Sequence, residues 1–184
     1  MEKQITEIKK EYPYQFSYRT TGQFERLISG FKRHCSPTAI SNIILSIRPE
    51  LNPDLVFKRV AKIGTSHLIY WNMDLFKTFG GTSDFFTGAY LRMALHAFGI
   101  YDRKVSFGGM ARPRKLRDAF NRGSLVLLAM HNHPKYKSHH VVCYGIKAQE
   151  GKLYLLLADG WKAGKTVIPY DELNFTIFFE VRPN

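Results

Sequence analysis

Cys35 is the residue with the clearest potential for chemistry in this sequence. It stands immediately before Ser36-Pro37, a pair typical of a helix start, because serine caps free backbone N–H groups and proline fits the first turn. Free N–H groups and the positive end of the helix dipole stabilise a thiolate at such a position. The thiolate is the nucleophilic form of cysteine. The common alternative for a free cysteine is a small, buried apolar residue.

Two adjacent histidines, His139 and His140, open an apolar run that predicts a β-strand over 139–146. A histidine fixed on a strand is suited to act as a general base. Neighbouring side chains on a strand point to opposite faces, so only one of the pair is expected to face a given site. The alternative is that both are surface residues at the start of the strand.

Asp159 comes directly after a second predicted strand, 152–158. A hairpin between the two strands would place the start of the first beside the end of the second. Asp159 would then lie next to His139 or His140, where a carboxylate can hold an imidazole in the tautomer that a thiol nucleophile requires. The alternative is a turn aspartate before Gly160, which is frequent in loops.

The elements that must position these residues are helical first and β-stranded second. Helical spacing and stop signals predict helices over 2–10, 37–48, 53–62, 84–98 and 113–121. Short apolar runs predict strands over 124–130, 139–146, 152–158, 165–169 and 175–182. This order predicts an α+β fold, with N-terminal helices packed on a C-terminal antiparallel sheet of about five strands.

Length and composition are those of one domain with a full core. The chain has 184 residues, of which 45% are hydrophobic. We expect one domain, 1–184, made of an N-terminal extension (1–30), a helical part (31–122) and a sheet part (123–184). Two cysteines exclude a disulfide scaffold and a four-cysteine zinc site. The sequence shows neither a membrane-spanning apolar run nor a signal peptide, so a cytoplasmic location is expected.

Taken together, the three motifs resemble the papain-like cysteine peptidases of the bacteriocin-processing (double-glycine) group. The segment 34–40, HCSPTAI, is similar to that group's Cys-Gly-Pro-Thr/Ala-Ala motif. The segment 138–145, SHHVVCYG, resembles its His-aromatic-Val-Val-x-x-Gly strand, and 159–161, DGW, resembles its Asp-Pro-Trp turn. The resemblance spans roughly residues 30–180 and extends to the order of the motifs along the chain.

This resemblance implies a papain-like fold with a catalytic triad. Cys35 would be the nucleophile, His139 would pair with it and protonate the leaving group, and Asp159 would orient His139. The register selects His139, because Gly145 lies six positions after it, and gives His140 a supporting role. The implied reaction is hydrolysis of a peptide or amide through a thioester, with no cofactor and no metal.

Further residues take their roles from the same resemblance. Trp161 would shield the Asp–His hydrogen bond from water. The group usually has a glutamine about six residues before the cysteine, whose amide binds the oxyanion. Ser29 stands at that position here, and Gln23 is the nearest glutamine upstream, so both are oxyanion candidates. A papain-like acyl or aminoacyl transferase, or an inactive binding homologue, is an alternative within the same fold.

A basic nucleic-acid-binding or zinc-dependent protein is the alternative from another class. The formal net charge of +12 attracts polyanions. Four of the seven histidines, His131, His133, His139 and His140, lie within ten residues, and His-x-His on a strand can bind zinc. However, no acidic ligand is near them in sequence. A peptide or amide substrate, with acidic peptides as one option, is therefore preferred to nucleic acid; the oligomeric state is left open.

Overall fold

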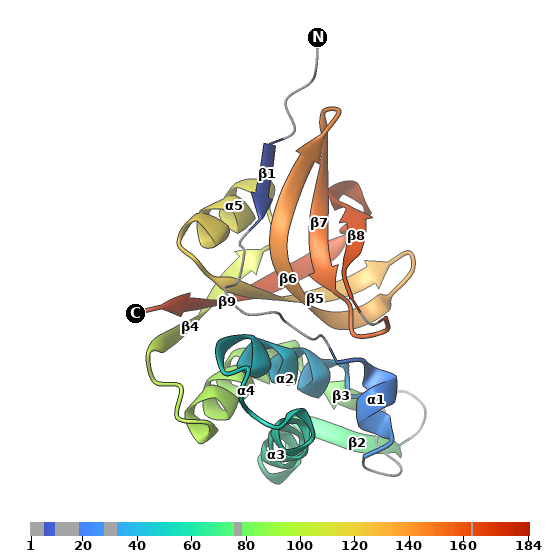
Figure 1. Cartoon of the computed structure of the whole chain (residues 1–184). Helices are drawn as coiled ribbons and strands as arrows, with labels where there is room; N and C mark the ends of the chain where they lie inside the picture. Colours follow the sequence, from blue (N-terminus) through green and yellow to red (C-terminus); the bar gives the residue numbers. More distant parts are fainter. Residues whose placement is uncertain (1–5, 10–18, 28–32, 76–78, 163) are drawn as a thin grey trace.

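The computed structural model describes residues 6–9, 19–27, 33–75, 79–162 and 164–184. Helices gather mainly on one face of an antiparallel sheet, which defines an α+β fold (Figure 1). The helices are α1 (Thr21–Glu25), α2 (Cys35–Ile47), α3 (Pro53–Ser66), α4 (Asp84–Ala97) and α5 (Pro113–Asn121), with a 3-10 turn η1 (Tyr170–Glu172). The strands are β1 (Thr6–Lys9), β2 (Tyr70–Leu75), β3 (Phe79–Thr82), β4 (Arg103–Met110), β5 (Leu125–His133), β6 (Lys137–Gln149), β7 (Lys152–Ala158), β8 (Thr166–Pro169) and β9 (Phe175–Pro183).

The main sheet runs in the order β4-β9-β5-β6-β7-β8, and β1 adds to β6 beyond the end of β5. All of these pairings are antiparallel. The sheet is therefore larger than the predicted one. The polar, glycine-containing segment 103–110 did not signal a strand, and it forms one by pairing with the C-terminal strand β9. A separate hairpin, β2–β3, lies beside the helices.

The predicted helix over 2–10 is wrong for the residues that the structure describes there. Thr6–Lys9 forms strand β1, which pairs with 145–148 of β6. Sheet pairing overrides the weak helical preference of such a short polar segment. The remaining residues of that predicted helix lie outside the described part of the chain.

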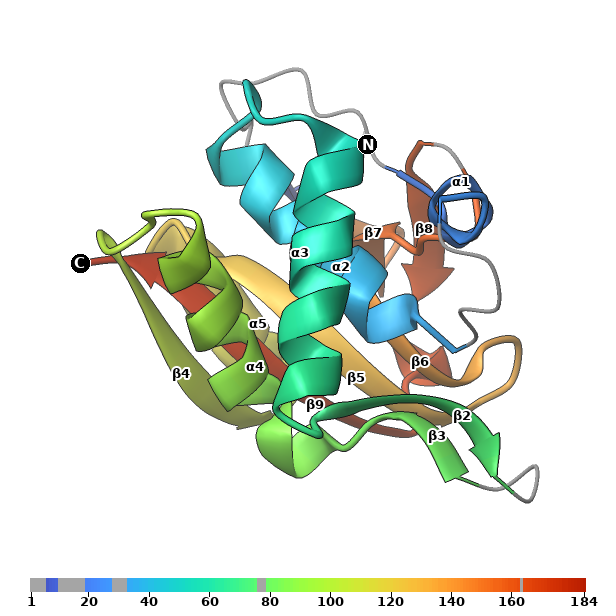
Figure 2. The ribbon, with the colours of Figure 1, turned by 90° about the horizontal axis from the view of Figure 1, so that it is seen from below.

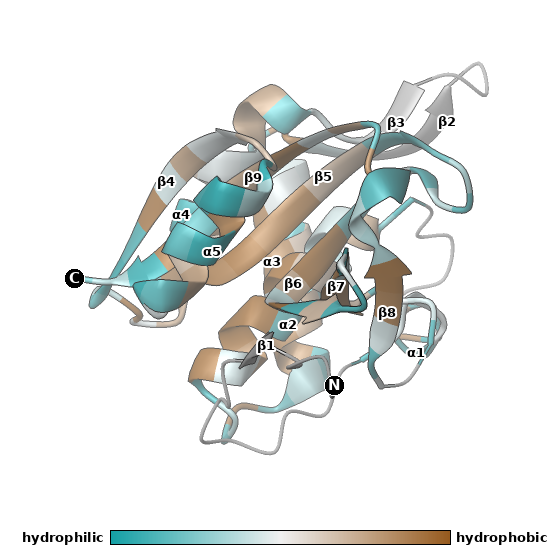
Figure 3. Cartoon of the chain, turned by 90° about the horizontal axis from the view of Figure 1, so that it is seen from above, coloured by the Kyte–Doolittle hydropathy of each residue, from teal (hydrophilic) through white to brown (hydrophobic). Residues whose placement is uncertain are grey.

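Two apolar layers sandwich the sheet, and β6 contributes to both. On one side α2, α3 and α4 cover the sheet, as seen from below in Figure 2. There Val142 packs in the same cluster as Ile40 and Ile43 of α2. On the other side α5 lies over β5 and β6, whose apolar residues are brown in Figure 3. Val141 and Cys143 point to this second side, so β6 alternates strictly up to Cys143.

A β-bulge interrupts this alternation after Cys143. Cys143 pairs with Leu157 and Gly145 with Leu156, so Tyr144 is an extra residue on β6. Residues near the start of β6 can therefore be assigned to a face of the sheet by counting from Val142. Counting from Gly145 gives the wrong face, because the bulge lies between.

Among the described residues, no helix combines the length and the apolar character needed to cross a bilayer.

Candidate active site

Cys35 is the first residue of α2, so its thiol lies at the positive end of a helix that is almost wholly buried. The neighbouring Pro37 has no N–H, and Thr38 donates its N–H to the His34 carbonyl at 2.9 Å. The His34 ring is fixed by a 3.2 Å contact between its Nδ1 and the Thr38 hydroxyl. Burial of α2 thus holds Cys35 rigidly at the surface of the core, where its side chain is partly exposed.

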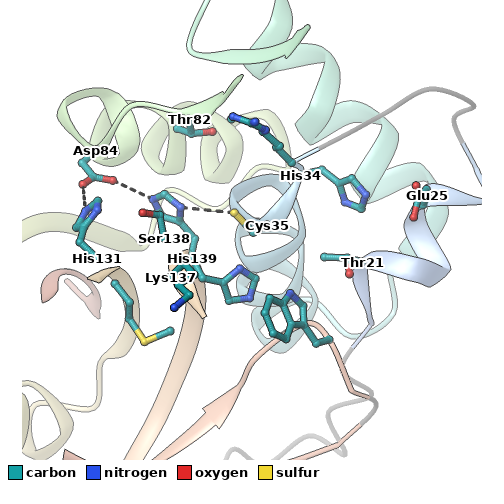
Figure 4. Close-up of a pocket in the computed structure, with 15 residues that line it drawn as sticks. Thr21, Glu25, His34, Cys35, Thr82, Asp84, His131, Lys137, Ser138 and His139 are labelled. Atoms are coloured by element: carbon teal, nitrogen blue, oxygen red, sulfur yellow. Dashed lines mark hydrogen bonds and ion pairs between the residues drawn. The ribbon is translucent and has the colours of Figure 1, made fainter. Parts of the chain in front are cut away.

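The thiol opens into a cleft of about 610 Å³ between the helices and the sheet (Figure 4). One wall comes from α1, the start of α2, β3 and the first residue of α4. The other wall comes from β5, the start of β6 and Trp161. Cys35, His139 and His140 all line this cleft, so the structure brings these three predicted residues together.

His140 lies directly behind the thiol. Its Nδ1 is 3.8 Å from the Cys35 Sγ, and its Nε2 is 3.3 Å from Oδ1 of Asp84, the first residue of α4. Thr87, one turn further along α4, places its hydroxyl 3.5 Å from the same Nε2. The second Asp84 oxygen accepts a hydrogen bond from His131 (Figure 4). Cys35, His140 and Asp84 therefore form one continuous chain of contacts.

His139 is fixed in a different way. Its Nε2–H donates to the backbone carbonyl of Asp159 at 2.7 Å, and its ring stacks on Tyr136 with centroids 5.4 Å apart. The Trp161 ring also packs against the His139 ring, with centroids 4.9 Å apart, and 47% of Trp161 is exposed. Asp159 thus does hold His139, as the hairpin argument predicts, but through its main chain.

The Asp159 carboxylate has other partners. It accepts hydrogen bonds from the hydroxyls of Tyr136 and Thr166 and from the backbone N–H groups of Trp161 and Lys162. Burial would raise the pKa of this carboxyl, but these hydrogen bonds outweigh burial and lower the pKa. The predicted hydrogen bond from this carboxylate to a histidine is not formed. The carboxylate oxygens are occupied by the four donors named above.

Strand alternation explains why His140 is the histidine behind the thiol. His140 is two residues before Val142, which packs on α2, so its side chain points towards α2. His139 shares the face of Val141. Its ring reaches the cleft at the strand end, where the pairing of β5 and β6 loses its regular register beyond Met130. The spacing to Gly145 crosses the bulge at Tyr144 and so does not determine which histidine faces α2.

Both imidazoles act on the thiol. Burial alone would raise the pKa of Cys35, but hydrogen bonds to His139 and His140, together with their positive charge, hold it well below its ordinary value. Burial would lower the pKa of His140, but hydrogen bonds to Asp84 and Cys35 raise it to about 9. Burial would likewise raise the pKa of Asp84, but His140 and His131 lower it. At neutral pH these shifts favour a thiolate facing an imidazolium.

The two oxyanion candidates have different outcomes. The Gln23 side-chain oxygen accepts the Thr20 N–H at 2.8 Å in a capping box of α1, and Gln23 does not line the cleft. Ser29 lies outside the described residues. The backbone N–H groups at the start of α2 are candidate donors beside the thiol.

The side chains of the histidine cluster are held by other protein groups. His131 bonds Asp84, His133 Nδ1 accepts the N–H groups of Lys135 and Tyr136, and His139 bonds the Asp159 carbonyl. In the described part of the chain, no group of three or more histidine, cysteine or acidic side chains is arranged to hold a metal ion.

Asp84 is the residue of this site that sequence reasoning missed. Its position at a helix start is visible in the sequence as an acidic residue in the first turn of α4. No local pattern links it to His140, because the contact depends on how α4 packs against the sheet.

Neither the models of known protein families nor the curated protein sequences contain a match to this chain.

Proposed function

We propose that this protein is a cysteine-dependent amide hydrolase, a cysteine peptidase in which Cys35 is the nucleophile. The observation that carries the proposal is the placement of Cys35: it begins a buried helix and opens into a cleft that His139 and His140 also line, with His140 Nδ1 3.8 Å from its thiol. This is the environment that keeps a thiol ionised and aimed at an incoming carbonyl carbon.

The reaction follows from the geometry of the cleft. The Cys35 thiolate attacks the carbonyl carbon of a peptide or amide, and the oxyanion forms beside the backbone N–H groups at the start of α2. A β6 imidazolium gives its proton to the leaving nitrogen, and a thioester remains on Sγ. Water then attacks the thioester, releases the carboxylic acid and regenerates the thiolate. No metal or cofactor takes part in these steps.

The resemblance to double-glycine peptidases supports the same assignment. The resemblance implies a papain-like architecture. In that architecture the nucleophile begins a helix, and the helix packs on a sheet that carries the histidine. The order of α2, β6 and the turn after β7 is consistent with it. His139, supported by Asp159 and Trp161, is the general base that the resemblance assigns, and the Asp159 carbonyl takes the orienting role here.

Selective alkylation tests the nucleophile. Native protein is treated with iodoacetamide at pH 6, and the modified cysteines are mapped by mass spectrometry. Cys143 is an internal control, because burial raises its pKa to about 12 and its thiol donates to the Gly145 carbonyl. We expect Cys35 to react and Cys143 to stay unmodified. Reaction of Cys35 only after denaturation would overturn the proposal.

A further inference from the structure

We propose that His140 and Asp84 form the catalytic imidazole–carboxylate pair that supplies the proton to the leaving group, in addition to the His139 arm of the site. This inference rests on the proposed function and names a role that the resemblance gives to His139 alone. It follows from which histidine faces a carboxylate and which faces a neutral group.

The outer nitrogens of the two histidines face different partners. His140 Nε2 is 3.3 Å from the Asp84 carboxylate, whereas His139 Nε2 donates to the uncharged carbonyl of Asp159. A carboxylate stabilises an imidazolium far more than a carbonyl does. We therefore assign to His140 the positive charge that balances the Cys35 thiolate.

The inner nitrogen of His140 is placed to use that charge. Its Nδ1 is 3.8 Å from the Cys35 Sγ, so the proton that Asp84 helps to retain lies beside the reacting atoms. His140 is only 8% exposed, and Thr87 and Asp84 of α4 fix its other edge. A buried imidazole held at both nitrogens has little freedom to turn away from the thiol.

Asp84 is itself held in place. It begins α4, where the helix dipole favours a carboxylate, and its second oxygen accepts a hydrogen bond from His131. His131 is partly exposed and packs against Phe175. We therefore assign His131 as a positioning residue for Asp84, without contact to the thiol.

The Sγ–C bond forms as the C–N bond breaks, and the His140 Nδ1 proton moves to the departing nitrogen, which leaves as a neutral amine and leaves His140 neutral. When water attacks the thioester, its proton passes to an imidazole Nδ1, the C–S bond breaks, and the thiolate–imidazolium pair is restored. The acid product loses its remaining proton to solvent.

The ionisable groups that act on His140 are Cys35 on α2 and Asp84 on α4. His131 on β5 acts on Asp84, and His139 on β6 acts on Cys35. Tyr70 of β2 also faces the thiol; burial and the Cys35 charge raise its pKa, so it stays neutral. Asp84 contacts His140 and His131 but not the thiol. Replacing Asp84 therefore changes the His140 arm of the site and leaves the His139 arm in place.

The test measures the pH dependence of Cys35 alkylation in Asp84→Asn, His140→Gln, His139→Gln and His131→Gln. We expect His140→Gln to raise the thiol pKa towards its ordinary value of about 8.5 and to slow alkylation at pH 6 roughly 100-fold, because few thiolates remain there. Asp84→Asn should also raise the thiol pKa and slow alkylation. His139→Gln should also raise the thiol pKa, because His139 is a second partner of the thiol, and His131→Gln should have the smallest effect. Circular dichroism of each variant checks folding.

An NMR titration of the imidazole protons gives a readout that folding damage alone would not imitate. In wild type, His140 should stay protonated to about pH 9. This titration should move to lower pH in Asp84→Asn and in Cys35→Ala, because each change removes a negative partner. A neutral His140 at pH 7, or a thiol pKa that His140→Gln and Asp84→Asn leave unchanged, would overturn the inference. If wild-type Cys35 has no lowered pKa, it is the proposed function that fails.

Discussion

Asp159 is the clearest case in which a side chain predicted for catalysis serves the fold. Its carboxylate accepts four hydrogen bonds that tie the turn after β7 to Tyr136 and Thr166, and its carbonyl fixes His139. The residue therefore supports the site through the shape of the turn. Its negative charge is stabilised by these four hydrogen bonds.

Asp159→Asn should therefore destabilise the protein in a pH-dependent way. The pKa of Asp159 is lower in the folded state than the unfolded value of about 3.9, so its contribution is complete above that value and is lost as pH falls through the folded pKa. We expect a loss of about 1–3 kcal/mol at pH 7 and a smaller gap from wild type at pH 3.

Urea unfolding at both pH values measures this, with the exposed Asp171→Asn as the matched control. An equal gap at pH 7 and pH 3 would mean that the ionised carboxylate is not the stabilising form.

The residue identities of the site were largely readable from the sequence, but their partners were not. Cys35, His139, His140 and Trp161 all line the cleft, and their catalytic and supporting roles stay predictions. Local patterns identify a helix start and a strand start, because these depend on neighbouring residues. The link from His140 to Asp84 depends on the packing of α4 over the sheet, which no short pattern encodes.

At the scale of elements, the geometry of β6 determines which way each histidine side chain points. Its alternation puts His140 on the α2 side and His139 on the other, and its bulge at Tyr144 breaks the count from Gly145. A bulge adds one residue and thereby exchanges the two faces of a strand. Spacing within a motif is therefore a weak guide to direction wherever the strand is irregular.

Four of the five predicted helices form, as α2 to α5, and all five predicted strands form, as β5 to β9; α1 and β1 to β4 were not predicted. The 84–98 prediction coincides with α4 (84–97), and α2 begins two residues earlier than predicted, at Cys35 itself. Apolar spacing and capping residues are local signals, so they reveal helices directly. β4 and the β2–β3 hairpin are polar or glycine-containing, and their pairing partners decide their structure.

A glycine in α3 reports how closely the helical layer is packed. A Cβ at Gly64 would lie 2.6 Å from the Tyr90 hydroxyl and 2.7 Å from the Tyr70 Cβ, both of them buried. Gly64→Ala should therefore cost about 1–3 kcal/mol of folding free energy by overpacking, although alanine favours helix by up to about 1 kcal/mol.

Gly88→Ala in α4 is the matched control. Its Cβ would meet only the Phe179 ring, at 3.3 Å, where a small shift relieves the contact. Thermal unfolding of both variants should show a clear loss for Gly64→Ala and little change for Gly88→Ala. Equal effects in the two helices would contradict the close packing of α3 against Tyr70 and Tyr90.

At the scale of the whole molecule, the charge of +12 is not concentrated in the cleft. Among the residues that the structure describes, the charged side chains that line it are Glu25, Arg33, Asp84 and Lys137, two acidic and two basic. The outer face of α5 instead exposes Arg114, Lys115 and Arg117. A balanced cleft gives no local preference for acidic substrates, and the net charge acts on them only as a long-range field that salt screens.

The central claim is that Cys35 hydrolyses an amide bond, and digestion of a random peptide library tests it most directly. The library is incubated at pH 7 with wild type, Cys35→Ala and Cys143→Ala, and new peptide termini are identified by mass spectrometry. Cys35→Ala removes the nucleophile, whereas Cys143→Ala leaves the cleft intact. We predict cleavage by wild type and by Cys143→Ala, and none by Cys35→Ala. Cleavage that persists in Cys35→Ala, or a wild-type protein that cleaves no peptide, would contradict the account.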